Sequence, residues 1–228
     1  MKNSAITFAL ACFLALPCTA SAEIITFDFE GTAGADLDTA GASGSTSVTV
    51  GGITLTLTAT ANSGVFNQTL TGFGINASGT GDDTDAFDSQ LIFEAMSFTI
   101  SSNVALTDLT LVSFDFDRFG STADDAGAVT RNGVFLGGFA GGVFGDSDLS
   151  GADVLTLNQA GIINTDTLVL SSFGTPSGGT TQGFGLEAIT FNATVAAVPE
   201  PGVFGLLMVG LGFSIVRSRC QKRNAAAR

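Results

Sequence analysis

The chain has 228 residues, with 21 Asp and Glu against 8 Lys and Arg, and it contains no His, Tyr or Trp. Without an imidazole, neither a nucleophile–His–acid triad nor a His-ligated metal site can be built. The content of 45% apolar and 13% charged residues is unlike that of a disordered chain, and the length suits one domain or at most two.

Residues 1–22 have the layout of a secretory signal peptide. Lys2 is followed by the apolar run 5–16 and by the small residues 19–22, which end in an Ala-x-Ala cleavage pattern. The run is 12 residues long, which is too short to cross a bilayer of about 30 Å as a helix. We therefore expect an exported protein that is cleaved after Ala22.

From Glu23 to Ala197 the apolar residues recur with a period of two, which is typical of half-buried β-strands. In the first such segment Phe27 and Phe29 alternate with Asp28 and Glu30. The same pattern predicts further strands in the segments 48–50, 53–57, 92–100, 112–116, 155–157, 168–170 and 184–194.

Two dipeptides predict tight hairpin turns within this region. Gly51-Gly52 and Asn132-Gly133 each tolerate positive φ at both central positions of a two-residue turn. With the two strands on either side of Asn132-Gly133, around Val129 and Val134-Phe135, the segments amount to roughly nine to eleven strands without a convincing amphipathic helix. We predict an all-β domain over 23–197, an antiparallel, jelly-roll-like sandwich with Phe as its main large core residue.

The predicted domain is strongly acidic and contains no cysteine. It holds 20 acidic residues against Arg118 and Arg131, which gives a net charge of −18. That charge argues against a nucleic-acid partner, because no basic patch is available to neutralise phosphates. Cys12, Cys18 and Cys220 all lie outside 23–197, so the exported domain has no disulfide and must be stabilised by its core.

Two acidic residues depart from the alternation of apolar and polar positions. By strand parity, Glu94 shares a face with Met96 and Phe98, and Glu187 shares a face with Ile189. A buried carboxylate is costly unless it is paired or bound to a cation, so one hypothesis is a structural Ca²⁺, which prefers carboxylate oxygens. The alternative is that both residues lie at strand ends, where their side chains reach water. Further oxygen ligands would come from Asp82, Asp83, Asp85 and Asp88.

Residues 198–228 form a distinct C-terminal segment. The motif Val198-Pro199-Glu200-Pro201 precedes the uncharged stretch 202–216, and five of the eight cations follow in 217–228. A helix over 202–216 would be about 22 Å long and would span a thin bilayer. The positive-inside rule then places the basic end in the cytoplasm. The residues predicted to stop the helix in the membrane are Arg217, Arg219, Lys222 and Arg223.

The order of tripeptide, apolar helix and basic end resembles the PEP-CTERM sorting signal of Gram-negative bacteria, also catalogued as the ice-binding protein C-terminal domain. The resemblance covers Val198 to Arg223, with the motif at Pro199, Glu200 and Pro201. It implies that an exosortase, a membrane transpeptidase, recognises the tripeptide while the helix anchors the protein in the inner membrane. After processing, the protein would reach the cell-envelope surface or the extracellular matrix, where exopolysaccharide is an expected partner. The catalogue name does not imply ice binding.

The β-domain also resembles a group of uncharacterised exported domains that carry the same tail. This resemblance supports the fold and the export of the domain and implies no activity. The matching stretches are Gly72–Ile75, the acidic stretch that leads to Glu94, Ser113–Asp117 and Gly183–Ile189.

The function predicted from these features is that of an exported, exosortase-sorted surface or matrix protein without catalytic activity, and without a cofactor other than the hypothetical calcium. A calcium-dependent carbohydrate-binding module is the alternative, although the domain has no Trp or Tyr for stacking on sugars. A carboxylate-based hydrolase comes third. Its acids would come from the pairs Asp28/Glu30 and Asp115/Asp117, whose members lie about 7 Å apart along a strand.

Overall fold

The computed structural model describes residues 20–29, 37, 41–69, 72–76, 94–117, 126–140, 153–172, 183–196 and 210. One compact unit comprises Ala22–Val195, and the fold reported below is that of this unit. The predicted signal peptide up to Thr19 and the predicted tail, except Gly210, lie outside the described residues. Among the residues that are described, no helix is long and apolar enough to cross a membrane.

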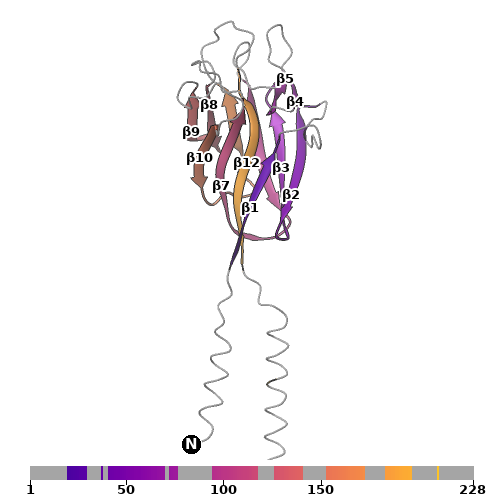
Figure 1. The fold of residues 1–228 in the computed structure, drawn as a ribbon, viewed down its shortest axis with the longest axis vertical. Helices are drawn as coiled ribbons and strands as arrows, with labels where there is room; N and C mark the ends of the chain where they lie inside the picture. The colour runs from indigo at the N-terminus through magenta and orange to yellow at the C-terminus, as the bar shows by residue number, and fades with distance from the viewer. Residues whose placement is uncertain are drawn as a thin grey trace, which may run out of the picture. The chain divides into compact units, whose positions relative to one another are not determined.

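The unit is built from two antiparallel sheets (Figure 1). Sheet I has the strand order β10-β7-β12-β5-β4, with β1 also paired to β12, and sheet II has the order β2-β3-β6-β11-β8-β9. The strands of sheet I are β1 (Ser21–Asp28), β4 (Val65–Thr69), β5 (Gly72–Asn76), β7 (Leu106–Asp117), β10 (Asp153–Gln159) and β12 (Gly185–Val195). Those of sheet II are β2 (Ser43–Val50), β3 (Ile53–Ala61), β6 (Ala95–Ser102), β8 (Ala126–Arg131), β9 (Val134–Ala140) and β11 (Leu168–Ser172). The prediction of an all-β, antiparallel, two-sheet domain is confirmed.

Phenylalanine rings fill the space between the sheets, as predicted. Phe98 of β6 meets Phe114 of β7 with ring centroids 6.2 Å apart, and Phe116 of β7 meets Phe139 of β9 at 4.4 Å. Each fully buried Phe contributes about 1.5–3 kcal/mol through the removal of its apolar surface from water. The fully buried rings are those of Phe27, Phe29, Phe73, Phe98, Phe114, Phe116, Phe184 and Phe191.

Both predicted hairpin turns are present. Gly51 and Gly52 have φ values of 57° and 83° between β2 and β3, and Asn132 and Gly133 have values of 51° and 78° between β8 and β9. Positive φ at both central residues is the geometry of the two-residue turn whose twist matches that of the flanking strands. These turns therefore set the register of the two hairpins in sheet II.

The described residues form twelve strands, where the sequence pattern predicts nine to eleven. The two additional strands are β4 and β5, whose segments do not alternate cleanly between apolar and polar residues. In β5 four successive residues from Gly72 are buried, because this strand packs closely on β12. A Cβ at Gly72 would lie 3.1 Å from Cα of Gly185, so glycine permits this approach of the two backbones.

Alternation in the predicted strand 112–116 places Val112 on the same face as Phe114 and Phe116, and this prediction is wrong. The register of β7 against β12 slips at Val112, which is an extra residue relative to the partner strand. A β-bulge of this kind shifts the side chains that follow it to the opposite parity. Leu111, and not Val112, accordingly lies in the core with the two rings.

The close contact of Gly127 with the aromatic cluster allows a test of this packing. A Cβ at Gly127 of β8 would overlap the ring of Phe139 and lie 2.9 Å from Cζ of Phe184. Gly127→Ala should therefore overpack the core and lower the free energy of unfolding by about 1–3 kcal/mol, as measured by denaturant titration. In a Phe139→Ala background the same substitution should cost less, because the obstructing ring is gone. Equal costs in the two backgrounds would contradict this account of the cluster.

Candidate functional site

Most residues of the predicted sorting and metal sites lie outside the described part of the chain. These are the sorting motif Pro199, Glu200 and Pro201, the membrane-stop residues Arg217, Arg219, Lys222 and Arg223, and the acidic residues Asp82, Asp83, Asp85 and Asp88. Of the predicted metal ligands, the structure places Glu94 and Glu187.

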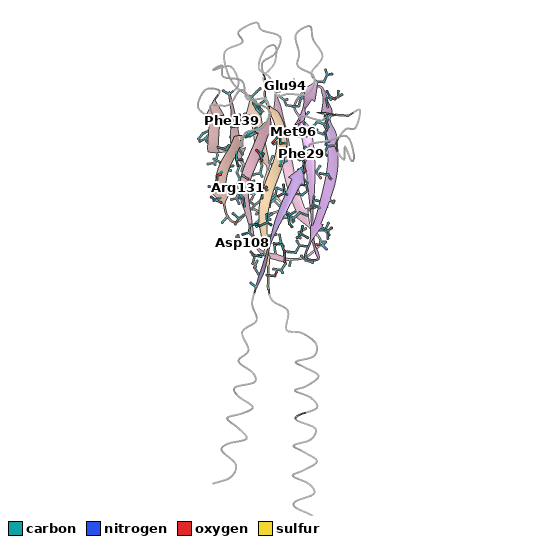
Figure 2. All side chains as sticks on the ribbon, in the orientation of Figure 1. Phe29, Glu94, Met96, Asp108, Arg131 and Phe139 are labelled. Carbon is teal, nitrogen blue, oxygen red and sulfur yellow. The ribbon has the colours of Figure 1, made fainter. Side chains whose placement is uncertain are left out.

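Glu94 is fully buried at one end of the sandwich (Figure 2). It immediately precedes β6 and continues the buried face of Met96 and Phe98, as its sequence position predicts. The main-chain N–H and carbonyl groups of Glu94 are both hydrogen-bonded to buried Ser172. The Ser172 hydroxyl accepts a hydrogen bond of 3.0 Å from the Glu94 N–H, and the Ser172 N–H donates one of 2.8 Å to the Glu94 carbonyl. The end of β11 thus fixes the carboxylate-bearing residue at the entry to β6.

Glu187 does not share the buried face predicted for it. In the register of β12 against β7, Leu186 pairs with Phe116 and Ala188 pairs with Asp115, so that Glu187 is an extra residue at a bulge. Leu186 is buried in its place and Glu187 is partly exposed. The carbonyl of Glu187 accepts a hydrogen bond of 2.7 Å from the N–H of Phe29, which connects β12 to the end of β1.

The described residues hold no group of three or more acidic or cysteine side chains close enough to bind a metal ion. The predicted calcium site combines Glu94, whose buried carboxylate is a ligand type that Ca²⁺ accepts, with Glu187 and with residues from 82–88, which lie outside the described part. The acid pairs considered for hydrolysis are described only in part. Asp28 is exposed, and an oxygen of Asp115 accepts a hydrogen bond of 3.1 Å from the N–H of Phe116. Glu30 and the side chain of Asp117 lie outside the described part.

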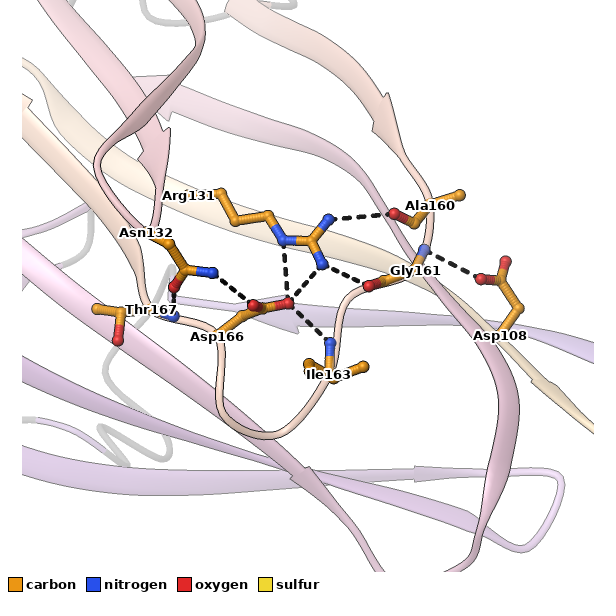
Figure 3. Close-up of polar contacts among 8 residues, drawn as sticks. All are labelled: Asp108, Arg131, Asn132, Ala160, Gly161, Ile163, Asp166 and Thr167. Carbon is orange, nitrogen blue, oxygen red and sulfur yellow. Dashed lines mark hydrogen bonds and ion pairs between the residues drawn. The ribbon is translucent and has the colours of Figure 1, made fainter.

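The most extensively bonded polar cluster joins Arg131, at the end of β8, to Asp166 in the segment before β11 (Figure 3). The Asp166 side chain is 5% exposed and lies 2.6 Å from Nη2 of Arg131. Nε of Arg131 donates a second hydrogen bond of 2.9 Å to the same carboxylate oxygen. The guanidinium also donates to the carbonyls of Ala160 and Gly161. Since all three guanidinium nitrogens bond to protein, this arginine clamps the 160–166 segment onto sheet II.

Asn132 completes the cluster from the turn that follows Arg131. Its amide nitrogen donates a hydrogen bond of 2.6 Å to the other oxygen of Asp166, and its amide oxygen accepts one of 3.0 Å from the N–H of Thr167. The N–H of Ile163 donates a hydrogen bond of 2.9 Å to Asp166. The β8–β9 turn and the segment before β11 are therefore tied together through one carboxylate.

These contacts determine the charge state of Asp166. Burial raises the pKa of its carboxyl group, but the hydrogen bonds from Ile163 and Asn132 lower it. The hydrogen bonds and positive charge of Arg131 lower it further, so the pKa lies below its usual value of 3.8. The carboxylate is thus ionised at neutral pH, and its contacts are structural.

The sequence pattern does not predict this cluster, although one signal for it is present. Arg131 is one of only two arginines in 23–197, and it directly precedes the predicted Asn132-Gly133 turn. Its partner lies 35 residues away, in a segment without hydrophobic periodicity. Only the pairing of β8 with β11 brings the two side chains together.

A half-open cavity of about 260 Å³ lies between the β6–β7 connection and the 162–164 segment. None of the described residues that line it is Asp or Glu. Its lining includes Ile100, Val104, Leu109, Ile162 and Asn164.

The outer face of sheet II carries a ladder of hydroxyl pairs between β2 and β3. The oxygens of Ser45 and Thr58, and those of Ser47 and Thr56, lie 2.8 Å apart. Thr49 and Thr54 continue the ladder at 2.9 Å. Sheet II contains no acidic residue in its six strands, whereas the strands of sheet I contain seven. The described strands of the two sheets therefore differ in their content of acidic residues.

No family model matches the chain, and neither the curated proteins nor the solved structures searched include a similar one. The resemblance of the tail to the PEP-CTERM signal remains a prediction from the sequence.

The depressed pKa of Asp166 predicts an acid-sensitive contribution to stability. A carboxyl group whose pKa is lowered by folding stabilises the protein above its unfolded pKa of about 3.9, and this contribution is lost as the pH falls through the lower folded value. Asp166→Asn should destabilise the domain by about 1–3 kcal/mol at pH 7, and its deficit relative to the wild type should shrink below about pH 4.

Unfolding titrations of both proteins between neutral and acidic pH would measure this deficit. Arg131→Lys is the matched control, because it keeps the charge and loses the forked geometry. It should lose less stability than Asp166→Asn and should retain the acid dependence of the wild type. A deficit in Asp166→Asn that is independent of pH would argue against the assigned charge state.

Proposed function

We propose that the chain is an exported surface or extracellular-matrix protein that is sorted by an exosortase and has no catalytic activity of its own. The observation that carries the proposal is the order of segments: a signal-peptide pattern, an acidic β-domain, and then Pro199-Glu200-Pro201 with an apolar stretch and a basic end. The support from the structure is that the middle segment forms one compact all-β unit. We also propose that the connections between the strands of this unit are jelly-roll-like.

The physical chemistry of the tail is consistent with this function. Two prolines around Glu200 disfavour helix and leave the tripeptide extended and accessible. The uncharged stretch 202–216 would hold the tripeptide beside the membrane. The basic residues of 217–228 would remain on the cytoplasmic side. An enzyme in the membrane would then recognise a single negative charge at a defined distance from the bilayer.

A calcium-dependent carbohydrate-binding module is the second candidate. It is favoured by the complete burial of Glu94, which a bound cation would compensate. The hydroxyl ladder of sheet II also offers a neutral polar face that suits a polysaccharide. In this case the surface protein would contact the exopolysaccharide directly.

Replacement of Glu200 tests the sorting proposal. Glu200→Ala and the isosteric Glu200→Gln should both leave the protein in the inner membrane at its uncut mass, because each removes the recognition charge. Cell fractionation with detection by mass would show the accumulation. Gln221→Ala is the control, since it leaves both the tripeptide and the basic residues intact and should be processed normally. Normal processing of both Glu200 variants would exclude the tripeptide as the signal.

Calcium removal tests the second candidate. If Glu94 ligates calcium, the ion should raise the Tm of the full chain and a chelator should lower it again, because the ion binds only the folded state. Glu94→Gln should abolish the calcium response, while Glu187→Gln, at the partly exposed bulge, should weaken it less. If chelation does not change the Tm of the calcium-loaded wild-type chain, a calcium site that stabilises the fold is excluded.

A further inference from the structure

β2 is the outermost strand of sheet II and pairs with β3 alone in the described part of the chain (Figure 1). Its register runs without interruption from Ser43 opposite Thr60 to Val50 opposite Ile53. It is eight residues long and contains neither a charged residue nor proline. Natural proteins usually protect such an edge with charge, proline or a bulge, since it otherwise offers backbone groups to another strand.

The hairpin register identifies the backbone groups that face outward. Val50 and Ile53 flank the two-residue turn and form a hydrogen-bonded pair. Because such pairs alternate with non-hydrogen-bonded ones, the N–H and C=O groups of Ser45, Ser47 and Thr49 point away from β3. Their hydroxyl contacts of 2.8–2.9 Å across to β3 agree with this assignment, since side chains are closest in non-hydrogen-bonded pairs.

The other outer strands are protected. β1, which pairs with β12 outside the main strand order, carries Glu23 and Asp28. β4 donates a hydrogen bond from the N–H of Phe66 to the carbonyl of Gly41. β9 slips in register against β8 and packs beside β10. β10 slips against β7 and begins with Asp153. Among the described strands, β2 is the outer strand that combines regular geometry with an uncharged sequence.

Charge limits what can approach this edge. The domain carries a net charge of −18, so two copies repel each other. The sheet II strands next to the edge, β3 and β6, are uncharged like β2 itself. The carboxylate of Glu23 in β1 lies beside Gly51, in the turn at one end of β2. A second copy would meet that acidic group at the turn and uncharged residues along the rest of β2, so its approach along the strand meets little charge repulsion.

We propose that β2 is a dimerisation edge and that its occupant is β2 of a second copy, added antiparallel about a two-fold axis at Ser47. Ser47 would face Ser47 of the second copy, and Ser45 would face Thr49 of that copy. All three outward-facing residues then enter hydrogen-bonded pairs, with two N–H···O bonds in each pair. The partly buried Val48 and Val50 become more buried against the added strand. The hydroxyl ladder continues across the contact between the two β2 strands.

Self-pairing fits this edge because its sequence is self-complementary. A two-fold axis at Ser47 places small hydroxyl residues opposite one another, with no like charges in contact. The inference does not depend on the proposed sorting function, because it uses only the geometry and charge of sheet II.

The test measures the mass of the full chain in mild detergent by sedimentation and uses charge reversal at the axis. The wild type should be a dimer. Ser47→Lys and Ser47→Asp should each be monomeric, because each places like charges opposite one another on the axis. An equimolar mixture of the two variants should restore a dimer, because opposite charges then meet. The matched control is the pair Thr99→Lys and Thr99→Asp, on the same exposed face of β6 but away from the edge, which should both remain dimeric.

Three results would overturn the proposal: a wild-type chain that is monomeric up to its solubility limit, a dimer that persists in Ser47→Lys, or a mixture that fails to reassociate. Far-UV circular dichroism would establish that each variant is folded. Should the charged variants misfold, Ser47→Cys in a chain with Cys12, Cys18 and Cys220 replaced by Ser provides the second measurement. A short thiol cross-linker should then give a band at the dimer mass, and Thr99→Cys should not.

Discussion

The contact between phenylalanine rings of the two sheets is the interaction on which the rest of this domain depends. The domain has no cysteine and carries 20 acidic residues against two arginines, so neither disulfides nor a balanced set of ion pairs can stabilise it. Rings such as Phe98 and Phe114, or Phe116 and Phe139, join the sheets directly. Their burial must offset both the chain entropy and the repulsion among the acids. The polar features of the surface are arranged around that core.

Strand bulges decide which polar side chains this core has to accommodate. Glu94 and Glu187 have the same apparent status in the sequence, each on the parity of an apolar face. Glu94 directly precedes a regular strand and is buried, whereas the bulge at Glu187 turns Leu186 inward in its place. The same effect moves Leu111 into the core instead of Val112. A single inserted residue therefore leaves the Glu187 side chain partly exposed, whereas Glu94, which precedes a regular strand, is buried.

Alternation and turn chemistry are local properties, which is why they predict so much of this fold. The Phe27 and Phe29 face, both hairpin turns and the parity of Glu94 with Met96 and Phe98 follow from neighbours in sequence. Alternation alone leaves open whether Glu94 is buried or reaches water at the strand end. A bulge is a property of two paired strands, so Glu187 and Val112 could not be placed without the register of β7 against β12. The Arg131–Asp166 cluster joins residues that are 35 positions apart, and β5 lacks alternation because it packs closely on β12. The sequence pattern thus does not predict the features that depend on which strands pair and in which register.

The division of acidic residues between the two sheets also depends on which strands pair with one another. Along the chain, acidic and neutral strands follow one another because the connections β6–β7, β7–β8, β10–β11 and β11–β12 each pass from one sheet to the other. The net charge therefore looks evenly spread until the strands are sorted by sheet. Once they are sorted, the acids of the strands belong to sheet I, and the hydroxyl ladder belongs to sheet II. The described strands of sheet I therefore carry the charge that repels other acidic molecules, while sheet II ends in an uncharged strand of regular register.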